Sequence, residues 1–189
     1  MLIKFIFAIL TALFSNWAVG QTKTSFGSSD ANQCFHESNN PISLASTRIC
    51  SRAIREDNLS RRDLAATYTN RGIIFAAHGH FQRAMNDHNE AAELKPDLGK
   101  IYVNRGTVFH RLKEYEKALA EYEKALKLEK VPKDIIEYNR ALSLEKLKKI
   151  SAAIKAIKSA LRHNPNSIRS QEKLGKLNSL LAKSKKHSS

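Results

Sequence analysis

The sequence predicts an all-α protein, a solenoid of about three helix pairs with a capping helix at each end. Two observations lead to this prediction. The chain repeats itself every 34 or 35 residues, and within each repeat the apolar residues recur three or four positions apart, the spacing of one helix face. A third observation excludes collagen-like and low-complexity chains, because the 189 residues include only seven Gly and four Pro.

The repeat is clearest in three short segments that superimpose. Residues 68–72 (YTNRG) correspond to residues 102–106 (YVNRG) and to residues 137–141 (EYNRA). The same offsets relate small residues in the second helix of each pair: Ala84, Ala118 and Ala153. Glycine within a helix costs about 1 kcal/mol relative to alanine. We therefore expect the helices to approach closely at Gly72 and Gly106, opposite these alanines.

The elements follow in chain order. Residues 21–40 are polar, and we expect order there only near Cys34. The helical domain is expected over 41–183, and the tail 184–189 is basic. Within the domain we predict a capping helix at 42–56, repeats at about 65–98, 99–133 and 134–167, and a final capping helix at 168–183.

Local signals support these boundaries. Pro41 precedes the first capping helix. Residues 60–63 (SRRD) resemble a capping box that opens the next helix. Pro96 and Pro165 end second helices, because proline cannot donate a backbone hydrogen bond.

These segments resemble tetratricopeptide repeats (TPRs). An aromatic residue, a small residue, a second aromatic residue, alanines and a closing proline occur at that family's spacings over residues 65–167. The match departs from the pattern at Arg71, Arg105 and Arg140, where leucine is common. The resemblance implies a right-handed superhelix and the binding of a protein or peptide in a concave groove. It does not extend to the carboxylate clamp of some family members, because only Asn104 fits that pattern.

The concave face is predicted to be lined by first helices. Its residues share one helix face within each repeat, and they are Thr69, Asn70, Ile73, Ala77, Val103, Asn104, Thr107, Arg111, Tyr138, Asn139, Leu142 and Lys146. Asn70, Asn104 and Asn139 recur at one position. Their amides suit the backbone of an extended peptide, but they could equally hydrogen-bond between neighbouring helices and hold the stack together.

The first 20 residues are expected to form a cleaved secretory signal. Lys4 precedes an uncharged apolar run, and small residues end at Gly20, which makes Gln21 the first mature residue. The alternative is an uncleaved membrane anchor. We expect an exported protein, periplasmic or secreted. Cys34 and Cys50 are then expected to form a disulfide, worth about 3 kcal/mol in the loop-entropy picture, with two free thiols as the alternative.

Positive charge gathers at the C-terminal end. Residues 131–189 contain 14 Lys and Arg against four Asp and Glu, a net charge of +10. This could be an ordinary solvated face or a surface that docks acidic proteins. The alternative to a groove-binding adaptor is therefore an envelope-surface binder that uses this end on anionic lipid or polymer. We expect no nucleic-acid partner, since aromatic residues are not interleaved with the basic run, and at most peripheral contact with a membrane.

Signals of catalysis are weak. The sequence contains no glycine-rich phosphate loop, nucleophile elbow or His-Glu-x-x-His motif. His78, His80 and His88 form the best metal candidate, but no carboxylate pattern completes it. We therefore expect a non-enzymatic protein with no cofactor and no metal.

Overall fold

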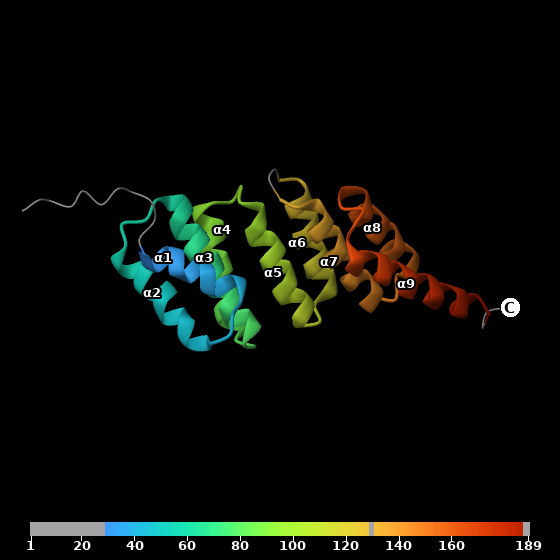
Figure 1. The fold of residues 1–189 in the computed structure, drawn as a ribbon, viewed down its shortest axis with the longest axis horizontal. Helices are drawn as coiled ribbons and strands as arrows, with labels where there is room; N and C mark the ends of the chain where they lie inside the picture. Colours follow the sequence, from blue (N-terminus) through green and yellow to red (C-terminus); the bar gives the residue numbers. More distant parts are fainter. Residues whose placement is uncertain (1–28, 129–130, 187–189) are drawn as a thin grey trace, which may run out of the picture.

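The computed structural model describes residues 29–128 and 131–186. Helices follow one another along the long axis of the molecule (Figure 1), and the described residues contain no strand. The predicted all-α solenoid is confirmed. In chain order the elements are α1 Ser29–Asn39, η1 Leu44–Ser46, α2 Thr47–Glu56, α3 Arg61–Ala77, α4 Phe81–Leu94, α5 Gly99–Arg111, α6 Tyr115–Leu126, α7 Lys133–Lys146, α8 Ile150–His163 and α9 Ile168–Lys186.

The helices pack as consecutive antiparallel pairs. The largest contacts join α3 with α4, α5 with α6 and α7 with α8, and each pair packs on the next. Alanines make the close packing possible: Ala84, Ala118 and Ala153 are fully buried. The last helix, α9, packs on α8 and runs to Lys186, three residues beyond the predicted capping helix.

Local sequence fixes the helix ends. The Ser60 hydroxyl accepts a hydrogen bond from the Asp63 backbone N–H at 3.1 Å, which starts α3 as the capping signal predicts. Each turn between a first and a second helix contains one residue with a left-handed backbone conformation. These residues are Gly79, Lys113 and Lys148, with φ of 81°, 65° and 58°. These positions are one repeat apart, so the register found in the sequence extends to the backbone of the turns.

The mid-helix glycines face rings and not the alanines that we expected. A Cβ atom on Gly72 would lie 2.6 Å from His88 Cε1, and one on Gly106 would lie 2.6 Å from Tyr122 Cε1. Both distances are too short for real carbon atoms, so the missing side chain makes room for the ring of the partner helix. Ala141 occupies this position in the third repeat, opposite the smaller side chain of Ile157.

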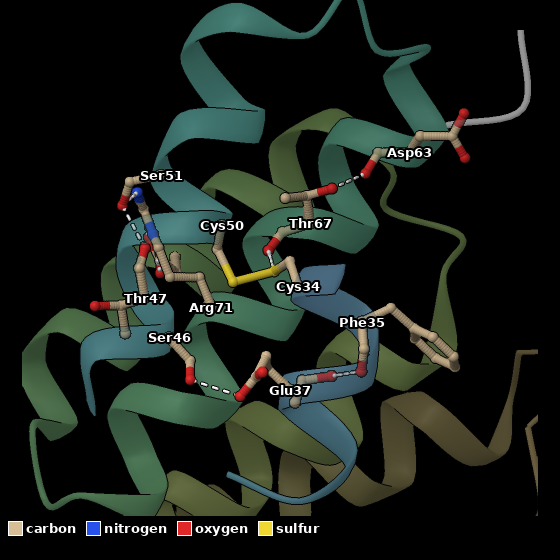
Figure 2. Close-up of a disulfide and its surroundings, with 12 residues drawn as sticks. Cys34, Phe35, Glu37, Ser46, Thr47, Cys50, Ser51, Asp63, Thr67 and Arg71 are labelled. Atoms are coloured by element: carbon tan, nitrogen blue, oxygen red, sulfur yellow. Dashed lines mark hydrogen bonds and ion pairs between the residues drawn. A yellow bond between two sulfur atoms is a disulfide. The ribbon is translucent and has the colours of Figure 1, made fainter. Parts of the chain in front are cut away.

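The N-terminal cap is a helix pair, where we expected a single helix. The segment 21–40 was predicted to be ordered only near Cys34, but residues 29–39 form α1, which packs against both α2 and α3. Figure 2 shows the bridge between α1 and α2: the sulfur atoms of Cys34 and Cys50 lie 2.11 Å apart, and both residues are fully buried. Cross-linking compensates for the few apolar residues that α1 contributes.

Arginines at one repeat position hold successive helix pairs together. Arg71 makes two hydrogen bonds to the Asp87 carboxylate on α4, at 2.7 and 2.9 Å, and a third to Ser51 on α2 at 2.8 Å. Arg105 repeats the arrangement one unit later, with the Glu121 carboxylate on α6 and Asn89 on α4. Each guanidinium therefore links its own second helix to the second helix before it. Bidentate pairs of this kind fix geometry as well as adding energy.

The third arginine has a different partner. Ala156 stands where Asp87 and Glu121 stand in the earlier repeats, so Arg140 has no acid on α8. Its side chain instead reaches back to Glu123 on α6 at 3.0 Å and to Glu137 on its own helix at 3.3 Å. These arginines, which depart from the usual leucine, thus serve the stack itself.

Candidate functional site

The first helices of the repeats, α3, α5 and α7, form the face on which the sequence places a groove. We call it the first-helix face. Two hollows lie on this face, both between α3 and α5.

The larger hollow, of about 380 Å³, lies near the N-terminal ends of α3 and α5. The predicted residues Thr69 and Asn70 line it. So does Phe35 of α1, whose side chain is half exposed. Sequence reasoning missed Phe35 because α1 itself was not predicted. Charged residues of both signs also line it: Arg62, Asp63, Lys95, Asp97 and Lys100.

The smaller hollow, of about 180 Å³, lies near the C-terminal ends of α3 and α5. We call it the His88 hollow, because His88 of α4 contributes to its lining. The other residues that line it are Ile73, Ala76, Ala77, Asn104, Thr107 and Arg111. Five of these six belong to the predicted groove; Ala76 was not predicted.

The remaining predicted residues do not line these two hollows. Val103 is buried and packs with Ile136 of the next repeat. Tyr138, one repeat later, lies under the guanidinium of Arg169 on α9, 4.6 Å from its ring centroid. This repeat position faces the next helix along the stack, so Val103 and Tyr138 belong to the packing between repeats. Half-buried Asn139 and Leu142 and exposed Lys146 complete the predicted set on α7.

The recurrent asparagines have unused amides. Asn70, Asn104 and Asn139 are half-buried, and the structure gives none of their side chains a hydrogen bond with another described residue. The sequence left two roles open, a structural link between helices or a ligand contact. The structure shows no such link, so these donors and acceptors are available to a ligand or to water.

His88 is the most unusual polar group near this face. Its side chain is fully buried, and neither ring nitrogen has a hydrogen-bond partner. A buried polar group without a partner typically costs about 1–3 kcal/mol. Burial, with the charge of Arg105 adding to it, lowers the pKa of His88 to about 3, so the imidazole is neutral at physiological pH.

The next repeat shows what His88 lacks. Tyr122 occupies the same position on α6, and its hydroxyl interacts with those of Thr107 and Ser143, which partly offset the burial that raises its pKa to about 12. His110 also hydrogen-bonds to Ser143, with 2.8 Å between Nδ1 and Oγ. Polar side chains thus satisfy one another at this second junction, between α5–α6 and α7.

The first junction, between α3–α4 and α5, has apolar residues at the equivalent positions. Ile73 stands in place of Thr107, Ala76 in place of His110 and Val108 in place of Ser143. His88 is also shorter than Tyr122. The outcome is an open space where the second junction has a polar network, and a ring whose nitrogens have nothing to bind. The register could have revealed this exchange, since the four positions can be compared without coordinates.

The histidines proposed as a metal candidate do not converge. His78 binds its own helix through Ile74 O at 3.0 Å, exposed His80 packs against the Phe75 ring, and His88 is buried on α4. Within residues 29–128 and 131–186, the structure contains no group of three His, Cys, Asp or Glu side chains arranged to hold a metal ion.

The basic C-terminal end is partly engaged in packing. Lys173 of α9 pairs with Glu145 at 3.0 Å, and Arg169 covers Tyr138. Lys155, Lys158 and Lys176 are exposed. None of the described helices combines the length and the apolar character needed to cross a bilayer.

Comparison with known proteins identifies the repeat. Residues 99–130 match the family model for the tetratricopeptide repeat. This segment begins with α5 and covers α6, the pair that carries Gly106 and Tyr122. The chain therefore carries a tetratricopeptide repeat at residues 99–130. A search among curated proteins finds no match to it.

Solved TPR structures share the fold. MamA from Desulfovibrio magneticus RS-1, from residue 41 to its end, superimposes with a TM-score of 0.64 at 20% identity, covering 86% of this chain and 91% of that one. The second TPR domain of human RPAP3, solved in complex with the HSP70 peptide SGPTIEEVD, gives 0.58 at 18% identity, covering 63% and 98%. YrrB, described as a TPR protein with an unusual peptide-binding site, gives 0.57 at 23% identity, covering 68% and 63%.

Proposed function

We propose that this TPR protein is a non-catalytic adaptor that binds an extended segment of another protein along the first-helix face. The observation that carries the proposal is the row of unused amides at Asn70, Asn104 and Asn139. Each amide offers two donors and an acceptor, and an extended peptide presents an N–H and a C=O at nearly every residue. A row of amides spaced by one repeat can therefore hold a backbone regardless of its side chains.

The surroundings of these amides support binding. Asn70 borders the larger hollow and Asn104 borders the His88 hollow, so a peptide held by both would place side chains in concave sites. The arginine pairs of Arg71 and Arg105 fix α3 and α5 relative to their neighbours. A rigid groove leaves most of the ordering cost to the ligand. Structurally similar TPR domains with bound peptides support the same use of the fold.

We further propose that the protein acts outside the cytoplasm, in the periplasm or as a secreted protein. The expected signal at residues 1–20 lies outside the described residues. The proposal is supported by the pairing of Cys34 with Cys50, because disulfides persist in oxidising compartments.

The second candidate is binding to an anionic envelope surface through the C-terminal end. The exposed lysines Lys155, Lys158 and Lys176 favour it. The engagement of Arg169 and Lys173 in packing argues for a partly structural role of this charge. The two candidates differ in salt dependence, since attraction between exposed charges is screened over about 8 Å at physiological ionic strength.

The test is selection from a random peptide library on the mature protein, followed by fluorescence anisotropy of the selected peptides. Asn104→Ala removes a groove amide. Asn178→Ala is the matched control, because Asn178 is exposed on α9 and distant in sequence from the groove. Both variants and the wild type are measured at about 50 mM and about 500 mM salt, which changes the screening length several-fold.

We expect peptides whose affinity falls about tenfold, or 1.4 kcal/mol, with Asn104→Ala, is unchanged with Asn178→Ala, and survives high salt. A library that yields no binder, or binders insensitive to Asn104→Ala, would reject the groove. Affinity for vesicles containing anionic lipid that disappears at high salt, with no peptide binding, would support the second candidate instead.

A further inference from the structure

The His88 hollow combines three features that point to a ligand. It is an open space of about 180 Å³ between α3 and α5. A fully buried imidazole with two unpartnered nitrogens contributes to its lining. Natural proteins rarely leave buried polar atoms unsatisfied, and those that remain call for an explanation such as a missing binding partner.

The mouth of the hollow carries a positive charge with no acidic partner. Arg111 is exposed and donates one hydrogen bond, from Nη1 to the carbonyl oxygen of Ala76 at 2.6 Å, and it lies over the Phe81 ring. The structure gives Arg111 no ion pair with a described residue, unlike Arg71 and Arg105. A guanidinium has five N–H groups, so donors remain for a ligand.

The polar side chains among the residues that line this space favour a hydrogen-bond acceptor. Neutral His88 has one N–H donor, the amide of Asn104 has two, and Arg111 has several. The residues that line the hollow include no Asp or Glu. The charge of nearby Arg105 is already balanced by Glu121. A hydroxyl could satisfy His88 but would leave the charge of Arg111 unmatched, and a cationic side chain would be repelled by it.

We propose that the His88 hollow is a pocket for the carboxylate of an aspartate or glutamate side chain in the bound segment, with His88 and Arg111 as donors to its oxygen atoms. The proposal rests on the proposed function, since the acidic side chain belongs to a peptide held along the first-helix face. The ring nitrogens are covered in the free chain. The carboxylate therefore enters with a small rearrangement of side chains at the mouth, a common event on binding.

The second junction explains why this pocket occurs once among the described junctions between full repeats. There Tyr122, Thr107, His110 and Ser143 interact with one another, and no buried ring nitrogen is left without a partner among the described residues. The first junction has no such internal network, and the carboxylate of the ligand supplies the missing hydrogen-bond partner. His88 thus determines specificity, while the asparagines hold the backbone.

The experiment is methyl NMR with two blocked tripeptides, acetyl-Gly-Asp-Gly-amide and acetyl-Gly-Asn-Gly-amide, on the folded mature protein. Methyl groups of Ile73, Ala76, Ala77 and Thr107 line the hollow and report its occupancy directly. His88→Phe keeps a ring of similar size and removes both nitrogens, and Arg111→Gln removes the charge. Arg83→Gln, on exposed Arg83 of α4, removes the same charge elsewhere.

We expect saturable shifts of these methyl signals with the aspartyl peptide and about tenfold weaker binding of the asparaginyl peptide, a difference of 1.4 kcal/mol. His88→Phe and Arg111→Gln should each weaken the aspartyl peptide about tenfold, with Arg83→Gln unchanged. Equal binding of both peptides, or shifts confined to other methyl groups, would overturn the pocket.

The two proposals fail separately. Selected library peptides that bind in an Asn104-dependent way, with no aspartyl preference at the hollow, would leave the groove standing and reject the pocket. Aspartyl binding at the hollow with no binding of any longer peptide would support the carboxylate site and reject the adaptor.

Discussion

The ring of His88 lies so close to the backbone of Gly72 that a Cβ on Gly72 would come within 2.6 Å of Cε1. The first helix pair therefore depends on the absence of a side chain at one position and the presence of a ring at another. The same relation recurs between Gly106 and Tyr122, one repeat later. It couples a fold-defining glycine to the residue that lines the candidate pocket.

A double-mutant cycle tests this coupling. Gly72→Ala should destabilise the protein by about 1–3 kcal/mol, because the His88 ring cannot shift without disturbing the packed interface. In a His88→Ala background the same change should be neutral or stabilising by up to about 1 kcal/mol, since alanine favours helix. Urea denaturation gives all four free energies of unfolding. Gly175→Ala is the control, because nothing lies within 4 Å of that position; equal costs of Gly72→Ala in both backgrounds would contradict the contact.

The buried His88 also predicts a pH dependence of stability. Burial lowers its pKa to about 3 in the folded chain, against about 6.5 when unfolded. The unfolded state therefore binds more protons between these values, and stability is lost as pH falls below about 6.5. From about pH 7 to about pH 5, wild type should lose about 2 kcal/mol more than the His88→Gln variant.

Denaturant titrations at several pH values measure this difference. Other titrating groups are common to both proteins and cancel in the comparison. Parallel pH curves for wild type and His88→Gln would show that His88 is not held neutral by burial.

The ion pair of Arg71 with Asp87 predicts a stability contrast. Both side chains are mostly buried, at 19% and 6% exposure, and they share two hydrogen bonds. Asp87→Ala should cost about 3 kcal/mol, because it leaves a largely buried guanidinium unpaired. The exposed pair of Lys117 with Glu114 is the reference, and Glu114→Ala should cost at most about 1 kcal/mol. Thermal unfolding of both variants checks the contrast. Equal losses of stability would show that the Arg71–Asp87 pair does not stabilise the stack more than an exposed ion pair does.

The bridge between Cys34 and Cys50 predicts a loss of stability on reduction. It encloses 15 residues, so the paired variant Cys34→Ala/Cys50→Ala should unfold about 3 kcal/mol more easily. The protein purified without a reductant should show no titratable thiol before reduction. Two titratable thiols, together with an unchanged melting temperature on reduction, would refute the bridge.

The periodic part of the fold was predictable because its signal is local. Offsets of 34 and 35 residues place Gly72, Gly106 and Ala141 in one register, and no coordinates are needed to see it. Helix α1 escaped prediction for a physical reason. Its eleven residues are largely polar, and its packing depends on Cys34 and on tertiary contacts with α2 and α3.

The site was predictable in outline and not in detail. Helix periodicity identified the face that contains Asn70, Asn104 and Arg111. It could not separate Val103 and Tyr138, which face the next helix of the stack, because residues at one helical spacing can serve either the groove or the packing. The register shows that Val108 replaces Ser143 near His88, but the unpartnered ring nitrogens and the hollow beside them needed the coordinates.

Site-specific photocrosslinking in living cells of the native host tests the central claim most directly. A benzophenone side chain is placed at Thr107 on the first-helix face, at exposed Glu90 on the opposite helix of a pair, or at exposed Lys176 on α9. The groove account predicts a discrete adduct of one partner protein from Thr107, absent from Glu90 and Lys176. An adduct from Lys176 alone, with none from Thr107, would contradict it.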